Sequence, residues 1–153
     1  MEIQFAGAAR EVTGSCHIVR VNGKTLALDF GLFQGRRAES EAKNRRLPFD
    51  VEELDAVVLS HAHIDHSGRL PLLLREGYEK TIWCTPATRD LCAIMLADAA
   101  HMGAGFLAAA LDRLADDVDG GALRVLDLLA QQQGFVGDGD IGAEDLQQLA
   151  RLG

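Results

Sequence analysis

The chain has few of the residues that would place it in several common classes of protein. It contains only three cysteines among 153 residues, and none of them forms a CxxC pair. The sequence therefore predicts neither a disulfide framework nor a zinc site closed by cysteines. No apolar run approaches the ~20 residues that cross a bilayer, and no basic segment leads into an apolar one at the N-terminus. We expect reduced thiols, no secretory signal, no membrane partner and a cytoplasmic location.

Positive charge is also scarce. The chain has 15 lysines and arginines against 23 aspartates and glutamates, a formal net charge of −8, which argues against a general nucleic-acid binder. The acidic surplus is concentrated after residue 101, whereas the front part, residues 1–101, is nearly neutral. This acidity does not exclude a phosphate-bearing substrate, because bound divalent cations would add positive charge locally. The front part also contains a basic cluster, Arg36, Arg37, Lys43, Arg45 and Arg46.

The pattern of apolar residues predicts a layered α/β or α+β domain. Strands are expected over residues 3–5, 16–21, 25–30, 54–59 and 81–84, with Asn22-Gly23 as a hairpin turn. Helices are expected from residue 65 or 67 to about 75 and from 86 to about 101, while 34–46 is a loop or weak helix. The remainder, 103–153, reads as a helical tail with segments at 104–116, 121–133 and 143–151.

The most informative segment is His61-Ala62-His63-Ile64-Asp65-His66, which follows the apolar run Ala56–Leu59. Imidazole and carboxylate groups bind zinc and similar divalent ions, and the cluster has no cysteine, which favours an open, water-bearing catalytic site. His61 and His63 are two residues apart, so persisting strand geometry would direct both rings to one side. Asp65 and His66 form a second set, and two sets suggest two adjacent metals.

At these residues the chain resembles the metallo-β-lactamase superfamily. The flanking segments resemble its β-CASP branch of RNA-processing nucleases, over roughly residues 1–102. The segments that carry this resemblance are Gly7–His17, Leu28-Asp29-Phe30-Gly31-Leu32-Phe33-Gln34-Gly35, His61–Gly68, Gly68-Arg69-Leu70-Pro71 and Thr85–Leu91. The resemblance implies the N-terminal half of an αββα sandwich, followed by a helical C-terminal segment.

The resemblance also implies roles for individual residues. His61 and His63 would ligate a first metal, and Asp65 and His66 a second, with Zn²⁺ the expected ion at both positions. Asp65 would in addition orient or deprotonate the attacking water. Asp29 would support the metal loop through hydrogen bonds. The loop from Gly7 to Ser15 would lie near the mouth of the site.

The sequence departs from the family pattern after residue 102. His101 in Ala100-His101-Met102-Gly103 vaguely resembles a third-motif histidine, but it is better explained as the end of the preceding helix. Asp140 in Gly139-Asp140-Ile141-Gly142 resembles a bridging aspartate without the apolar strand that should precede it. Both stay candidate ligands. We therefore divide the chain into a partial metallo-β-lactamase domain, 1–102, and a helical tail, 103–153, that does not match the family.

These residues support three hypotheses of function. The first is a zinc-dependent hydrolase that cleaves RNA phosphodiester bonds by a metal-activated water. The second is a truncated, non-catalytic module that binds metal or a partner. The third is a metallo-β-lactamase-fold hydrolase of a small ester or thioester. Because half of the sandwich would lack the second sheet, we also expect the exposed apolar face to be covered by the tail, a second copy or a partner chain.

Overall fold

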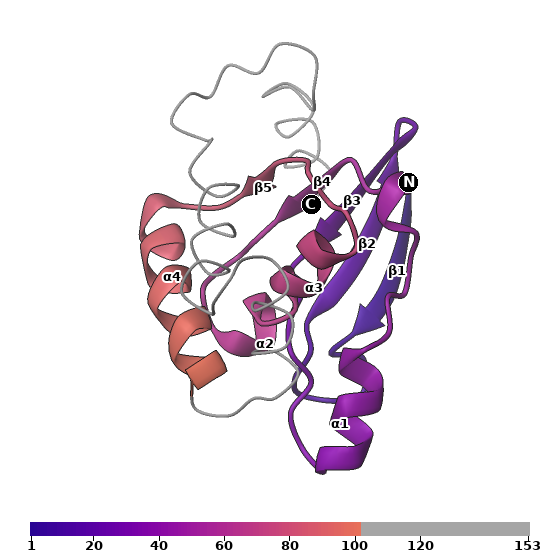
Figure 1. Ribbon diagram of the computed structural model, residues 1–153. Helices are drawn as coiled ribbons and strands as arrows, with labels where there is room; N and C mark the ends of the chain where they lie inside the picture. The colour runs from indigo at the N-terminus through magenta and orange to yellow at the C-terminus, as the bar shows by residue number, and fades with distance from the viewer. Residues whose placement is uncertain (102–153) are drawn as a thin grey trace.

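The structure, a computed structural model, describes residues 1–101 as one mixed sheet with helices packed on it (Figure 1). This confirms the α/β character expected from the sequence. Among the described residues, no helix combines the length and apolarity needed to cross a bilayer. The strands are β1 (Glu2–Gly7), β2 (Cys16–Val21), β3 (Lys24–Leu28), β4 (Ala56–Val58) and β5 (Ile82–Trp83). The helices are α1 (Arg37–Asn44), the short 3-10 helix η1 (Val51–Glu53), α2 (Ile64–Ser67), α3 (Leu70–Arg75) and α4 (Pro86–His101).

The five strands lie in chain order across the sheet. The pairs β1–β2 and β2–β3 are antiparallel, and the predicted Asn22-Gly23 turn joins β2 to β3 with positive φ angles of 52° and 77°, as a tight two-residue hairpin requires. The pairs β3–β4 and β4–β5 are parallel. The carboxyl ends of β3, β4 and β5 therefore meet at one edge of the sheet, which is where open α/β sheets generally carry their sites.

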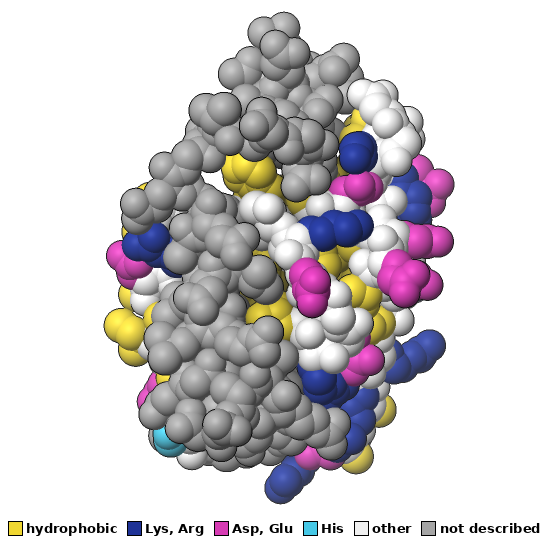
Figure 2. All heavy atoms as spheres, turned by 45° about the horizontal axis from the view of Figure 1, so that its top comes forward, with side chains coloured by type: hydrophobic (Ala, Val, Ile, Leu, Met, Phe, Trp, Pro, Cys, Tyr) yellow, Lys and Arg dark blue, Asp and Glu magenta, His cyan; other side chains and the backbone are white. Residues whose placement is uncertain are grey.

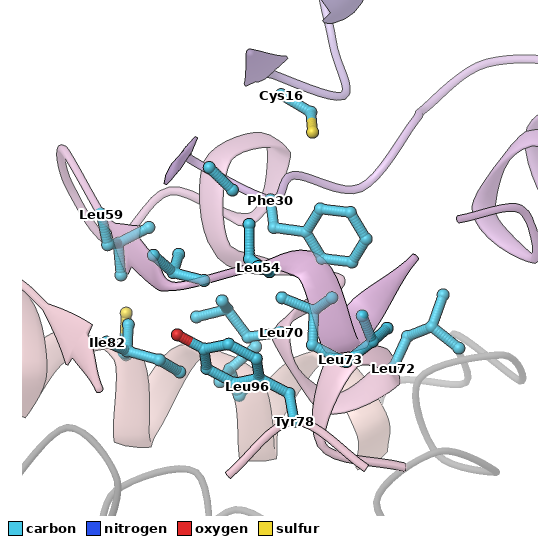
Figure 3. Close-up of a cluster of buried hydrophobic side chains, with 14 of the residues drawn as sticks. Cys16, Phe30, Leu54, Leu59, Leu70, Leu72, Leu73, Tyr78, Ile82 and Leu96 are labelled. Atoms are coloured by element: carbon cyan, nitrogen blue, oxygen red, sulfur yellow. The ribbon is translucent and has the colours of Figure 1, made fainter. Parts of the chain in front are cut away.

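One face of the sheet forms the main core. Ile18, Ala27, Val57 and Ile82 are neighbours in the strand register, and all four are fully buried. Helix α3 contributes its leucines to the same cluster, and α4 contributes Leu96 (Figure 3). Helix α3 is buried along most of its length because four of its six residues are apolar and inward-facing.

The opposite face of the sheet is apolar as well. Val19, Leu26 and Ala56 form a second buried cluster, because side chains alternate between the two faces of each strand. On the same face, Phe5 of β1 is 67% exposed and Leu28 of β3 is 37% exposed. The expectation that the tail, a second copy or a partner covers this face stays a prediction.

The segment after β4 differs from the expected single helix. It forms two short helices, α2 and α3, separated at Gly68 and Arg69. Pro71 lies at the start of α3, and because proline has no N–H it cannot continue the hydrogen-bond ladder from α2. Arg69 marks the break with φ −101° and ψ 3°, outside ideal helical geometry. The region 34–46 contains a helix, α1, where the sequence predicted a loop or weak helix.

Candidate metal centre

The candidate centre lies at the edge where β3 and β4 end. Asp29 directly follows β3, and Ser60 to His66 follow β4. The parallel pairing continues past the strands, because the backbone N–H of Asp29 donates to the Val58 carbonyl at 2.9 Å. Asp29 has a φ of 60°, a left-handed conformation that aspartate adopts more readily than most residues. This backbone turn brings Asp29 to the segment that carries the histidines.

Gly31 allows the chain after β3 to approach the segment that carries the candidate metal ligands. A Cβ atom at Gly31 would lie only 1.6 Å from the Asp65 carbonyl oxygen and 2.7 Å from the His66 nitrogen. Backbone hydrogen bonds join the same two segments, from Phe30 N–H to the His66 carbonyl and from Leu32 N–H to the Ile64 carbonyl, at 2.8 and 3.0 Å. Only glycine therefore fits at this position, because any side chain would overlap the backbone of Asp65. The close approach lets the backbone hydrogen bonds hold this segment in place.

His61 and His63 lie together beyond β4, as their spacing predicts. Their rings are 4.7 Å apart between centroids, and His61 Nε2 is 3.2 Å from His63 Nδ1. The Ser60 hydroxyl lies 2.9 Å from His61 Nδ1 and donates to Asp29 Oδ2 at 3.0 Å. Since that hydroxyl has only one hydrogen, which it donates to Asp29, it accepts a hydrogen bond from His61 Nδ1–H. In a neutral His61 ring the free lone pair is then on Nε2, beside His63.

Asp65 and His66 form the second pair, on α2. His66 Nδ1 lies 2.7 Å from Asp29 Oδ2, and His66 Nε2 lies 3.7 Å from Asp65 Oδ2. Because an ionised carboxylate only accepts hydrogen bonds, Asp29 holds the hydrogen on His66 Nδ1 and leaves the lone pair on Nε2. The rings of His61 and His66 are 3.9 Å apart between centroids, so the two pairs are adjacent.

The Asp29 carboxylate is the most heavily hydrogen-bonded group of the centre. It is 7% exposed, its Oδ1 accepts from the Ser60 N–H at 2.8 Å, and its Oδ2 accepts from the Ser15 hydroxyl at 3.1 Å in addition to Ser60 and His66. The sequence predicts that Asp29 supports the metal loop, but it does not indicate Ser15 or Ser60 as its partners. No spacing rule relates Asp29 to residues that are 14 and 31 positions away in the chain.

The loop from Gly7 to Ser15 contacts the centre at its last residue. The Ser15 N–H donates to the Asp65 carbonyl at 2.8 Å, and the Gly31 N–H donates to the Ser15 carbonyl, also at 2.8 Å. Ser15 therefore ties the loop to both segments that build the centre.

The donor atoms present fit divalent metal ions. A tetrahedral zinc ion with bonds of ~2.0–2.1 Å holds neighbouring ligand atoms roughly 3.3 Å apart, close to the 3.2 Å between His61 Nε2 and His63 Nδ1. The Asp65–His66 separation of 3.7 Å is slightly wider. The arrangement is two pairs of donors, since no three ligand-type side chains within residues 1–101 group closely enough to hold one ion. Each pair thus offers part of a coordination shell.

Of the two further candidate ligands, His101 and Asp140, only His101 lies in the described residues. His101 is the last residue of α4, its side chain is exposed, and its Nδ1 lies 2.8 Å from the Ala97 carbonyl. No hydrogen bond or ring contact within residues 1–101 joins it to the other histidines. Asp140 and the predicted tail, 103–153, lie outside the described residues, so both stay predictions.

Comparison with known proteins identifies the family. A family model described as the metallo-β-lactamase superfamily matches residues 9–136. The chain belongs to the metallo-β-lactamase superfamily. Members of this superfamily generally bind metal ions, which agrees with the donor atoms gathered after β4.

Curated relatives of the chain belong to one branch of this superfamily. Ribonuclease TTHA0252 of Thermus thermophilus is 51% identical over 100 residues, which cover 65% of this chain and 22% of that protein. Transcription termination factor FttA of Methanocaldococcus jannaschii is 36% identical over 98 residues, which cover 64% of this chain and 16% of that protein. Integrator complex subunit 11 of Danio rerio is 36% identical over 100 residues, which cover 60% of this chain and 16% of that protein. These relatives are β-CASP members, which confirms the resemblance. The chain spans about a fifth of the length of the ribonuclease and less than a fifth of the length of FttA and subunit 11.

Proposed function

We propose that the chain carries the metal-binding part of a hydrolase that cleaves phosphodiester bonds in RNA. The observation that carries the proposal is the pair of adjacent donor sets, His61 with His63 and Asp65 with His66, at one edge of the sheet. The choice of RNA is supported by the name of the Thermus thermophilus relative, a ribonuclease.

In this proposal His61 and His63 hold one zinc ion, and Asp65 and His66 hold a second. When bound, the ions supply Lewis-acid chemistry, lowering the pKa of water toward ~7 and neutralising negative charge on a phosphoryl group. Asp65, with a side chain 26% exposed, orients water and accepts its proton at a carboxylate oxygen. His63 is exposed, so substrate reaches the centre from its side.

The groups behind the ligands hold their rings in a metal-binding state. Asp29 fixes the hydrogen of His66 on Nδ1, and Ser60 fixes that of His61 on Nδ1. Both Nε2 lone pairs are then available without any proton having to move before the ion binds. Because Ser60 itself donates to Asp29, one carboxylate controls both rings.

The test is cleavage of a labelled single-stranded RNA by the 153-residue chain with added zinc. The variant Asp65→Asn should slow cleavage by at least ~100-fold, as expected for loss of a general base, and chelation should abolish cleavage. The matched control is Asp55→Asn, since Asp55 precedes β4 and pairs with Lys24 at 3.1 Å, away from the histidines. Cleavage that survives chelation, or equal losses in the two variants, would contradict the proposal.

A second candidate is a metal-binding or interaction module without catalysis. It is favoured by the finding that, within residues 1–101, donors form pairs and no group of three. Metal analysis separates the two candidates: two zinc ions per chain with turnover supports the hydrolase, whereas fewer than two without turnover supports the module. A panel that adds small ester and thioester substrates tests the third hypothesis in the same assay.

A further inference from the structure

A cavity of about 350 Å³ lies between β1, the C-terminal end of α1 and the break before α3. Its walls include Gln4 of β1, Phe33, one acidic residue, Glu11, and three basic residues, Lys43, Arg46 and Arg69. None of the proposed metal ligands lines it. The cavity is therefore separate from the candidate metal centre, and a ligand bound in it would not depend on the proposed function.

Arg69 is a buried cation without an acidic partner. Its side chain is 1% exposed, and no carboxylate within residues 1–101 lies at ion-pair distance from it. Nε donates to the Gly31 carbonyl at 2.6 Å and Nη1 to the Arg46 carbonyl at 3.2 Å, while Nη2 is buried with no partner among the described residues. A buried charge usually has a counter-ion, and an unpartnered buried donor on a side chain that borders a cavity points to an acceptor bound there.

The guanidinium is held rigidly in this position. It lies 4.2 Å from the Phe30 ring centroid and 4.7 Å from that of Phe33, and Asn44 holds the Phe33 backbone through two hydrogen bonds of 2.8 and 2.9 Å. Burial lowers the pKa of Arg69 to about 10, so the group is still a cation near neutral pH. A planar guanidinium with unused N–H groups is suited to phosphate oxygens.

The other charges around the cavity leave a positive surplus. Lys43 is paired with Glu11 at 2.7 Å and Glu39 at 3.3 Å, so its charge is compensated. Arg46 is exposed and has no ion pair among the described residues. With Arg46 and Arg69, the three cations face the two carboxylates of Glu11 and Glu39, which leaves a surplus of one positive charge. Figure 2 shows some lysine and arginine side chains at the lower right, the side on which Figure 1 draws α1, and others elsewhere on this face.

We propose that this cavity binds a phosphate oxyanion, with the Arg69 guanidinium as its buried cation and Arg46 as its exposed donor. The volume of about 350 Å³ exceeds what one water molecule occupies, about 30 Å³, by a wide margin. The phosphate is either free in solution or part of a nucleic-acid backbone, and both sources present the same oxygens to the two arginines.

The experiment is calorimetric titration of the whole chain at low ionic strength with inorganic phosphate, and separately with a short single-stranded RNA. The test variant is Arg46→Ala, which keeps the backbone carbonyl that Arg69 uses. The matched control is Arg45→Ala, which removes the same charge from the adjacent exposed residue outside the cavity. Arg69→Lys, with folding checked by circular dichroism, tests the buried donor directly.

Arg46→Ala should weaken binding roughly tenfold, as expected for the loss of one charge-assisted hydrogen bond, and Arg45→Ala less than about twofold. A difference between the two variants with inorganic phosphate identifies a site for free phosphate; a difference with RNA alone identifies a backbone phosphate. Equal effects of the two variants on both ligands, or no saturable binding of either, would overturn the proposal. This comparison decides the question even if Arg69→Lys does not fold.

Discussion

Replacing Asp29 by asparagine should disrupt the candidate metal centre. The Asp29 carboxylate receives four hydrogen bonds, one at Oδ1 from the Ser60 N–H and three at Oδ2 from Ser15, Ser60 and His66. An asparagine carboxamide has one acceptor atom and one donor atom. In either orientation its NH₂ group therefore faces a donor, the backbone N–H of Ser60 or the cluster around His66.

The loss of stability in this variant depends on the hydrogen bonds that Asp29 can no longer accept. The variant replaces charge-assisted hydrogen bonds by a donor-donor conflict at a site that is 7% exposed. A hydrogen bond to a charged group contributes ~1.5–3 kcal/mol, and an unsatisfied buried group costs a similar amount. We expect Asp29→Asn to lower the free energy of unfolding by about 3 kcal/mol in urea titrations. Where the NH₂ group faces His66, the hydrogen of that ring moves to Nε2, and zinc affinity should fall ~10–100-fold.

Two assays check this prediction, with Asp55→Asn as the control. Burial opposes ionisation of Asp55, but the N–H of Thr25 and the ammonium of Lys24 outweigh it and lower the pKa of Asp55. Asp55 is thus a second hydrogen-bonded carboxylate, but it lies away from the histidines. Its variant should lose stability without losing zinc affinity. Nitrogen-15 NMR of the His66 ring reports the position of its hydrogen without metal. A stability loss under ~1 kcal/mol with His66 unchanged would refute the reasoning.

Three other residues can be tested in the same way. Gly31→Ala should destabilise the fold by about 3 kcal/mol or more in thermal unfolding and weaken zinc binding, because the new Cβ would overlap the Asp65 carbonyl; a variant with wild-type stability would contradict this. Since Asp55 has a lowered pKa in the folded state, its contribution to stability is present above the unfolded pKa of about 3.9 and is lost on acidification. The wild-type advantage over Asp55→Asn should shrink as pH falls below about 4, measured by urea titration across pH. Burial raises the pKa of Cys16 to about 12, so iodoacetamide at about pH 8 should modify half-buried Cys84 first, as peptide mapping by mass spectrometry would show.

The sequence predicted those features that depend on neighbouring residues. Alternation and the Asn22-Gly23 turn predict β2 and β3, and the period of two predicts that His61 and His63 share a side. The break between α2 and α3 was missed, although Pro71 signals it, because the apolar pattern continues through it. The roles of Ser15 and Arg69 depend on contacts across 14 and 38 positions of the chain, which local patterns do not encode.

The parallel pairing of β3 with β4 also has a consequence for the order in which the chain folds. The hairpins β1–β2 and β2–β3 close over short stretches of chain, whereas Asp29 reaches Ser60 across 31 positions. Non-local pairings close late because chain entropy must first be lost. We therefore expect the candidate ligand pairs to become properly oriented only after β4 has docked, late in folding. An ion bound there would slow unfolding far more than it would speed folding, so zinc should lengthen the lifetime of the folded chain and leave the rate of its formation nearly unchanged.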